Sequence, residues 1–311
     1  MLSRRSIRVK IMQVLYAMNR DEQLDYQRAL QSYQTKIRSS FELYLLALRY
    51  LIHITRYARQ DSQKKKAKLR PTEEDRTFKA HLVDQSVMAS LIENEGLQKL
   101  FRLYKIEDKI DSDTVRLVYQ DFAKKEAYKT YVSQTEVSDE QQVSIMLSLL
   151  KTCFNNEVFV EALEDHYPNY IDDKSLIVGA IKKNLKALPL ADDFYEQYRP
   201  NRETTVDFGE ALIRKVYEEE ESLMTIIEPV LKNWDADRVA VIDLILLKMA
   251  LSELLDFPSI PTKVTLNEFV EISKLYSTDK SKDFINGILD RLMKQLLDEG
   301  RINKKGRGLI G

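Results

Sequence analysis

The sequence predicts an all-α protein, and three observations support that prediction. Apolar residues recur at helical spacing along nearly the whole chain, whereas the apolar–polar alternation of a strand is hard to find over any strand length. The 311 residues include only 8 glycines and 7 prolines, so we expect few turns and long helices. A chain of this length forms one large or two modest domains, and we expect two helical units.

The first segment of the chain, MLSRRSIRVKIMQVLYAMN, combines an apolar stripe with basic side chains and has no acidic residue. Ile7, Ile11 and Val14 fall on one face of a helix, which predicts a first helix that packs into a core. The same composition also suits a targeting peptide, a membrane-surface helix or an arm for nucleic acid. The basic residues, at or beyond the edge of the apolar face, are Arg4, Arg5, Arg8 and Lys10.

The chain between residues 26 and 194 offers a succession of helical segments without a recognisable motif. The stretch QKKKAKLRPTEED is the best exposed connection, because Pro71 disfavours helix at the preceding residue and Thr72 can open the next helix. Its lysine run is typical of a solvated loop, with contact to RNA as the alternative. We expect the helices at about 41–59, 74–104, 111–131, 139–164 and 172–187.

The pattern of the sequence changes after Pro200. The stretch TTVDFGEALIRKVYEEEESLMTIIEPVLKNW predicts a helix, and the nearly all-apolar residues 239–255 predict the centre of a bundle. The tetrapeptide TLNE predicts a capping box that opens the next helix, with Thr265 as N-cap and Glu268 three residues later. A last helix follows at about 282–297, and Gly300 offers a natural stop.

Catalysis finds little support in the sequence. The three histidines are scattered, and no phosphate-binding glycine loop or nucleophile elbow is present. The single cysteine, Cys153, suggests a reducing compartment and suits a buried structural thiol. No apolar run reaches the roughly 18 residues that a spanning helix needs. We therefore predict a cytoplasmic protein that is not an enzyme and uses no metal or cofactor.

Several motifs in the C-terminal part resemble the NusB family of transcription antitermination factors. They are LLKMALSEL, PTKVTLNEFVEISKLY and DFINGILD, which occur in the family's order and approximate spacing. The opening RRSIRVKIMQVLYAMN is similar to the family's arginine-rich first helix. The resemblance covers roughly residues 1–25 and 203–297.

The resemblance implies a NusB-like bundle with a helical region inserted after its first helix, because ordinary family members are much shorter. A first helix that belongs to this bundle also disfavours a targeting peptide and a membrane-surface helix. The implied parts are the arginine-rich first helix at 1–25, the additional helical region at 26–194, the C-terminal core at 195–298 and a basic tail at 299–311.

The family's function implies binding of boxA-type nascent RNA together with NusE, a ribosomal protein that doubles as a transcription factor. The complex then joins an elongating RNA polymerase and supports transcription of ribosomal RNA. We expect Arg4, Arg5, Arg8 and Lys10 to contact RNA, since guanidinium groups bind phosphate and stack on unpaired bases. Positions that match the family's contact region for NusE are Asp243, Tyr276, Lys280 and Phe284.

Two other functions stay open. A NusB-like domain is also found fused to ribosomal RNA methyltransferases, so the chain could recruit RNA for a separate RNA-modifying enzyme. The chain could instead be a structural helical assembly protein, in which the inserted region mediates self-association. An RNA titration beside a measurement of oligomeric state separates these hypotheses.

Overall fold

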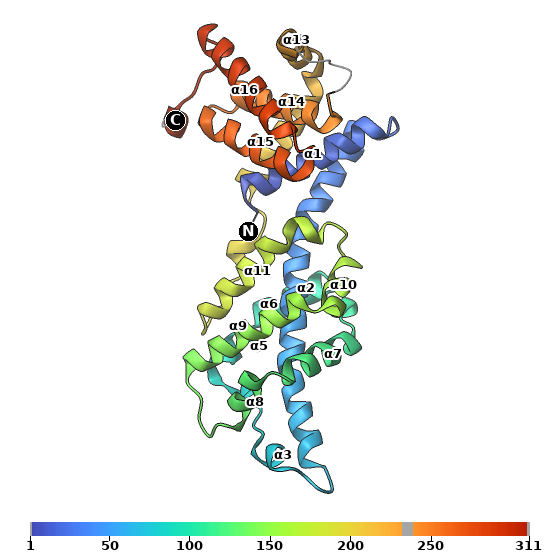
Figure 1. Ribbon diagram of the computed structural model, residues 1–311, viewed down its shortest axis with the longest axis vertical. Helices are drawn as coiled ribbons and strands as arrows, with labels where there is room; N and C mark the ends of the chain where they lie inside the picture. Colours follow the sequence, from blue (N-terminus) through green and yellow to red (C-terminus); the bar gives the residue numbers. More distant parts are fainter. Residues whose placement is uncertain (1, 232–238, 310–311) are drawn as a thin grey trace. The chain divides into compact units, whose positions relative to one another are not determined.

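A computed structural model describes residues 2–231 and 239–309 of the chain (Figure 1). Every regular element in these residues is a helix, and they contain no strand, which confirms the predicted all-α class. Residues 232–238, which hold the WDADR start of the family-like segment, lie outside the described residues. The side chain of Arg307 and the last two residues of the predicted basic tail lie outside them as well.

The chain divides into two compact units. Unit 1 comprises Arg38–Arg199, and unit 2 comprises Leu2–Ile37 together with Pro200–Gly311. Unit 2 therefore joins the two ends of the sequence. The long helix α2, Tyr26–Lys66, contributes its first part to unit 2 and the rest to unit 1.

Unit 2 is a bundle around helix α14, Val241–Asp256 (Figure 1). This helix is apolar on nearly all sides, and most of its residues are buried, which confirms its predicted place at the centre of a bundle. The helices that pack against it are α1 (Arg4–Arg20), α12 (Ala211–Glu218), α13 (Glu220–Leu231), α15 (Thr262–Tyr276) and α16 (Ser281–Asp298).

Helix α1 packs with the predicted face inward. Ile7, Ile11 and Val14 are almost fully buried. The hydroxyl of Ser3 caps the helix by accepting a hydrogen bond from the backbone N–H of Ser6 at 3.2 Å. The apolar spacing thus fixes which side of α1 faces the bundle.

Helix α15 begins earlier than the TLNE motif predicts. Pro261 occupies the N-cap position with φ −60°, and the helix starts at Thr262. A proline suits this place because it has no N–H to satisfy and its φ is already fixed. The prediction of Thr265 as the N-cap was therefore wrong: Thr265 is a buried residue inside the helix, and Glu268 lies one turn further along.

A π-helical segment, η4 (Glu203–Glu210), leads into α12. The hydroxyl of Tyr33, from the unit 2 part of α2, donates to the carbonyl oxygen of Thr205 at 2.8 Å. The tyrosine lies so close to Gly209 that an added Cβ there would overlap its hydroxyl. Glycine at this position thus lets a buried tyrosine reach the π-helical backbone.

Unit 1 consists of the rest of α2 and a set of shorter helices with an aromatic-rich core. Its longer helices are α7 (Ser112–Ala123), α9 (Asp139–Asn155) and α11 (Tyr170–Lys186). The shorter ones are α3 (Glu73–Thr77), α4 (His81–Asp84), α5 (Ala89–Ile92), α6 (Glu95–Leu103), α8 (Glu126–Ser133) and α10 (Glu157–Glu164). Short 3₁₀ turns in the described residues lie at Ser86–Met88, Glu107–Lys109, Glu196–Tyr198 and, in unit 2, Gly306–Leu309.

Three of the helices predicted in unit 1 are each divided in the structure. The segments 74–104, 111–131 and 139–164 each contain at least one break between helices. The side-chain oxygen of Asn94 accepts from the N–H of Leu97, and that of Asn156 accepts from the N–H of Phe159. Asparagine side chains compete in this way with the helical backbone, so each of them starts a new helix.

Other local predictions for the chain are confirmed. Thr72 caps α3 in a capping box with Asp75. Helix α2 ends before Pro71, but it extends beyond the predicted 41–59 at both ends. Gly300 adopts a φ of +66° just after α16, which suits a helix stop. Cys153 is buried, and burial raises the pKa of its thiol.

The C-terminal tail folds back onto the end of α14. The amine of Lys304 donates to the carbonyl oxygens of Glu253 at 3.2 Å and Phe257 at 3.1 Å. The backbone N–H of Lys305 donates to the carbonyl oxygen of Pro258 at 2.9 Å. A basic residue of the tail therefore satisfies carbonyl groups at a helix C-terminus, where positive charge is favourable.

Candidate nucleic-acid interface

The first turn of α1 presents two partly exposed arginines, Arg4 and Arg5, beside a cleft of about 430 Å³. The opposite wall comes from the start of α15, where Val264 is 43% exposed. An apolar side chain beside two guanidinium groups suits an unpaired base next to its phosphates. The full lining is Ser3, Arg4, Arg5, Arg8, Ile260, Pro261, Val264 and Glu268.

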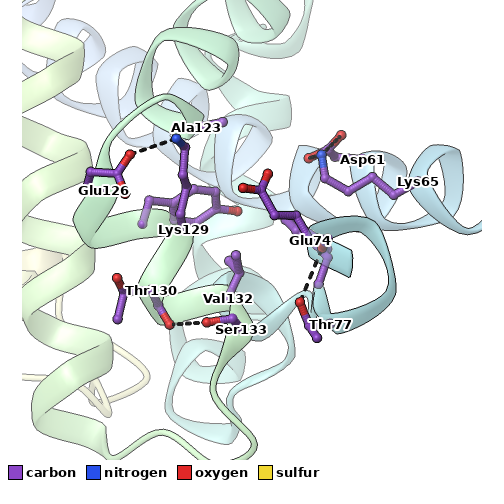
Figure 2. Close-up of a pocket in the computed structure, with 12 residues that line it drawn as sticks. Asp61, Lys65, Glu74, Thr77, Ala123, Glu126, Lys129, Thr130, Val132 and Ser133 are labelled. Atoms are coloured by element: carbon purple, nitrogen blue, oxygen red, sulfur yellow. Dashed lines mark hydrogen bonds and ion pairs between the residues drawn. The ribbon is translucent and has the colours of Figure 1, made fainter. Parts of the chain in front are cut away.

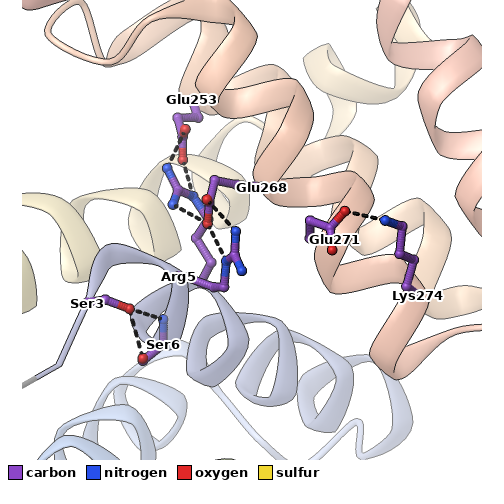
Figure 3. A network of polar contacts seen from close by, with 8 residues as sticks. Ser3, Arg5, Ser6, Glu253, Glu268, Glu271 and Lys274 are labelled. Atoms are coloured by element: carbon purple, nitrogen blue, oxygen red, sulfur yellow. Dashed lines mark hydrogen bonds and ion pairs between the residues drawn. The ribbon is translucent and has the colours of Figure 1, made fainter. Parts of the chain in front are cut away.

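Arg5 is held by a carboxylate on α15 (Figure 3). Its Nε donates to one oxygen of Glu268 at 2.8 Å, and its Nη2 donates to the other at 2.7 Å. These hydrogen bonds lower the pKa of Glu268 below its usual range and raise the pKa of Arg5. The bidentate pair fixes the direction of Arg5 while leaving about half of its side chain exposed.

Arg4 has a looser partner. Its Nη2 lies 3.2 Å from an oxygen of Glu203, whose side chain is largely exposed. Such a surface ion pair contributes about 0–1 kcal/mol, because water screens both charges. An incoming phosphate can therefore take the place of Glu203 at little cost.

Arg8 lies beneath these two residues in the interior of unit 2. Its Nε donates to one carboxylate oxygen of Glu253 at 2.7 Å, and its Nη2 donates to the other at 2.7 Å. The Arg8 side chain is only 2% exposed. The hydroxyl of Thr265 donates to Glu253 at 2.7 Å, and Arg8 also lies 3.5 Å from Glu268. The buried carboxylate of α14 is thus paired and hydrogen-bonded, as a buried charge requires.

The predicted contact of Arg8 and Lys10 with RNA stays a prediction, and both side chains are buried. Lys10 is 1% exposed, so neither side chain reaches the surface of unit 2. The apolar pattern of α1 did not reveal this, because Glu253 and Glu268, the partners of Arg8, lie far away in the sequence. Arg4 and Arg5 are the two predicted RNA-binding residues that the structure leaves at the surface.

Two phenylalanines support the guanidinium groups from below. The Cζ of Arg4 lies 5.6 Å from the ring centroid of Phe208, and that of Arg8 lies 5.2 Å from the same ring. The Cζ of Arg8 also lies 5.7 Å from the ring centroid of Phe269. Phe208 belongs to η4, so the π-helical segment places an aromatic face under both arginines.

The four residues predicted to meet NusE differ in exposure. Asp243 is buried at the start of α14, where one oxygen accepts from the hydroxyl of Ser281 at 2.7 Å. Phe284 is buried in α16, Tyr276 is half-buried at the end of α15, and Lys280 is exposed just before α16. The turn between α15 and α16 therefore offers two of the four side chains to a partner, while Asp243 and Phe284 lie inside.

Among residues 2–231 and 239–309, no group of three or more His, Cys, Asp or Glu side chains is placed to hold a metal ion. No single helix in that part of the chain is long and apolar enough to span a membrane, and only the pair α9 and α10, bent by 69°, reaches that length when taken together.

Comparison with known proteins connects residues 171–294 to a family model described as the NusB family. A solved structure, NusB of T. maritima, is 33% identical and covers 33% of this chain and 74% of its own, with a TM-score of 0.30. The sequence match thus begins in α11 and ends in α16.

Three curated relatives carry the name transcription antitermination protein NusB. The protein of Salinibacter ruber is 47% identical over 108 residues, which are 35% of this chain and 68% of that protein. The match to Chloroherpeton thalassium is 40% identical over 33% of this chain and about half, 49%, of the relative. The match to Geobacter sulfurreducens is 38% identical over 37% of this chain and 83% of the relative. The chain therefore belongs to the NusB family.

Proposed function

We propose that this protein is an RNA-binding transcription antitermination factor. It binds boxA-type nascent RNA together with NusE and joins the elongating RNA polymerase through that complex, which supports transcription of ribosomal RNA. The names of its relatives support the antitermination role. The proposal places the protein in the cytoplasm, away from membranes, and gives it no catalytic activity of its own.

The observation that carries this proposal is the pair Arg4 and Arg5 on a rigid, cleft-forming helix turn. Both guanidinium groups reach the surface, while the buried Arg8–Glu253 pair beneath them fastens α1 to α14. A single-stranded RNA gains affinity from phosphates that bind the arginines. It gains specificity from unpaired bases that rest against the cleft wall at Pro261 and Val264.

The NusE contact is proposed at the turn between α15 and α16. Lys280 is exposed there, and Tyr276 offers an aromatic side chain of the kind that dominates protein interfaces. Leu275, which is 74% exposed, adds an apolar side chain next to Tyr276. Asp243 acts in this proposal by holding Ser281 at the start of α16 rather than by direct contact.

We also propose which parts of the chain carry which functions. The NusB-like core consists of the first helix at 1–25 and the C-terminal part at 195–298, with the additional helical region at 26–194 between them and a basic tail at 299–311. Unit 2 contains the surface proposed for RNA and NusE. Unit 1 then supplies a function that shorter family members lack.

The test is a titration of the full chain with a boxA-type single-stranded RNA, with and without NusE. We expect specific binding that NusE strengthens, and no such binding to an RNA of the same length and scrambled sequence. Equal affinity for both RNAs would contradict the proposal. Binding of RNA without any response to NusE would favour the alternative, a module that recruits RNA for a separate modifying enzyme.

A further inference from the structure

The end of α2 and the start of its connection to α3 form a basic loop, defined here as residues 64–70. This stretch, KKKAKLR, has five basic residues and no acidic one. Lys64, Lys65 and Lys68 form polar contacts with neighbouring side chains. Lys66, Leu69 and Arg70 are exposed to solvent.

Polar contacts link the basic loop to the helices on both sides of it. The amine of Lys64 donates to the hydroxyl of Tyr57 at 3.1 Å. Lys65 pairs with Asp61 at 3.1 Å one turn earlier in α2, at the edge of a cleft of about 290 Å³ (Figure 2). The near side of the loop is therefore tied to the end of α2.

The far side of the loop is tied to α3. The amine of Lys68 donates to both oxygens of Asp75, at 2.8 and 2.9 Å. Asp75 also accepts from the backbone N–H of Thr72, and these bonds lower the pKa of Asp75 to about 2. The loop is thus linked to α2 at one end and to α3 at the other.

The remaining side chains of the loop lie at its surface without an acidic partner. Lys66 and Arg70 form no ion pair with any residue in the described part of the chain, and Leu69 is fully exposed. The acidic residues Glu73 and Glu74 follow directly in α3, so the unpaired positive charge is confined to the loop itself. These charges favour an anionic ligand.

We propose that the basic loop is a second phosphate-binding site for the RNA that unit 2 holds. The inference rests on the proposed function, which already brings RNA to the same molecule. Once one part of a strand is bound, a second contact on the same chain benefits from a high effective concentration, so two cations are enough to add affinity. A single exposed leucine is too small an apolar surface to anchor the loop in a membrane, which favours RNA over lipid.

The experiment uses the full chain, a short RNA limited to the boxA-type element, and the same element extended on both sides by unstructured sequence. The test variant is Lys66→Gln with Arg70→Gln. The control variant is Lys182→Gln with Lys186→Gln, which removes the same charge at the same spacing from exposed positions of α11 in unit 1. Circular dichroism confirms that both variants are folded.

We expect the wild type to bind the extended RNA more tightly than the short one. The test variant should lose about tenfold in affinity for the extended RNA, and its salt slope should shrink by about 1.4, at roughly 0.7 per phosphate contact. Its affinity for the short RNA, and both affinities of the control variant, should match the wild type.

Three results would overturn the inference. The first is an unchanged affinity of the test variant for the extended RNA, and the second is an equal loss in the control variant, which indicates diffuse electrostatics. The third is a loss of binding to phosphatidylserine vesicles without a change in RNA affinity, which assigns the loop to lipid. Failure of the proposed function is distinguishable, because the wild type would then not bind the short RNA at all.

Discussion

The guanidinium group of Arg8 in the first helix donates to both carboxylate oxygens of Glu253 in the central helix, at 2.7 Å each. Both side chains are almost fully buried. This ion pair joins the beginning of the sequence to the bundle formed near its end. Arg8 therefore stabilises the fold of unit 2, while Arg4 and Arg5 remain at the surface.

Replacement of Arg8 by alanine should destabilise the protein strongly. The change leaves the Glu253 carboxylate buried without its charge partner, and removal of one partner of a buried pair costs about 3–5 kcal/mol. The free energy of unfolding in urea measures this cost. The matched control is Arg4→Ala, which removes a surface ion pair and the contact with the Phe208 ring and should cost about 1–2 kcal/mol. Equal costs for the two variants would contradict the structural task of Arg8.

The Arg5–Glu268 pair should make stability depend on pH. Because the folded-state pKa of Glu268 is lowered, the pair stabilises the protein above the ordinary glutamate pKa of 4.5 and loses that effect as the pH falls through the folded-state pKa. Thermal melts between neutral pH and pH 3 should therefore show that the melting temperature falls less with decreasing pH in Glu268→Gln than in the wild type. Parallel curves for the two proteins would rule out this contribution.

The contact between Tyr33 and Gly209 predicts a coupled pair of substitutions. Gly209→Ala adds a Cβ that overlaps the Tyr33 hydroxyl, and overpacking of this kind costs about 1–3 kcal/mol. The cost should be smaller in a Tyr33→Phe background, which lacks the overlapping oxygen. A double-mutant cycle by urea denaturation measures the difference. Strictly additive effects would show that the two residues do not meet.

The proposed NusE surface predicts a loss of partner affinity without a loss of stability. Tyr276→Ala should weaken NusE binding by about 2 kcal/mol if the tyrosine lies at the centre of the interface. Lys280→Glu should alter NusE binding through charge, with the melting temperature unchanged. Calorimetric titration with NusE measures both effects.

Phe284 is unsuitable for this test, because it is buried and its truncation would cost about 3–5 kcal/mol of folding free energy. Wild-type NusE affinity in both Tyr276→Ala and Lys280→Glu would move the partner site elsewhere. Wild-type affinity for RNA in the same variants is the internal control, since Arg4 and Arg5 are unchanged.

Periodicity in the sequence predicted the features that depend on local pattern. The all-α class, the central helix and the inward face of α1 follow from apolar spacing, and the opening of α3 follows from Thr72. The breaks at Asn94 and Asn156 were missed, because a side-chain cap and a helical continuation have similar local sequences. The signal in the sequence is an Asn or Asp directly before the first apolar residues of the next helix.

The charged residues of the site were predictable only as a group. Four basic residues on one helix indicated a positive surface, yet two of them are buried. Their fate depends on partners that only the fold brings near, as Glu253 shows for Arg8. The TLNE motif illustrates the same limit: its threonine and glutamate bind Glu253 and Arg5 across the bundle instead of capping their own helix.

The central claim, that Arg4 and Arg5 bind RNA, is tested most directly by the salt dependence of affinity for a boxA-type RNA. The variant Arg4→Gln with Arg5→Gln is compared with Arg20→Gln with Arg28→Gln, which removes two other exposed arginines of unit 2. Loss of two phosphate contacts should reduce the slope of log affinity against log salt by about 1.4 in the first variant and leave the second at the wild-type slope. Equal slopes in both variants would contradict the claim.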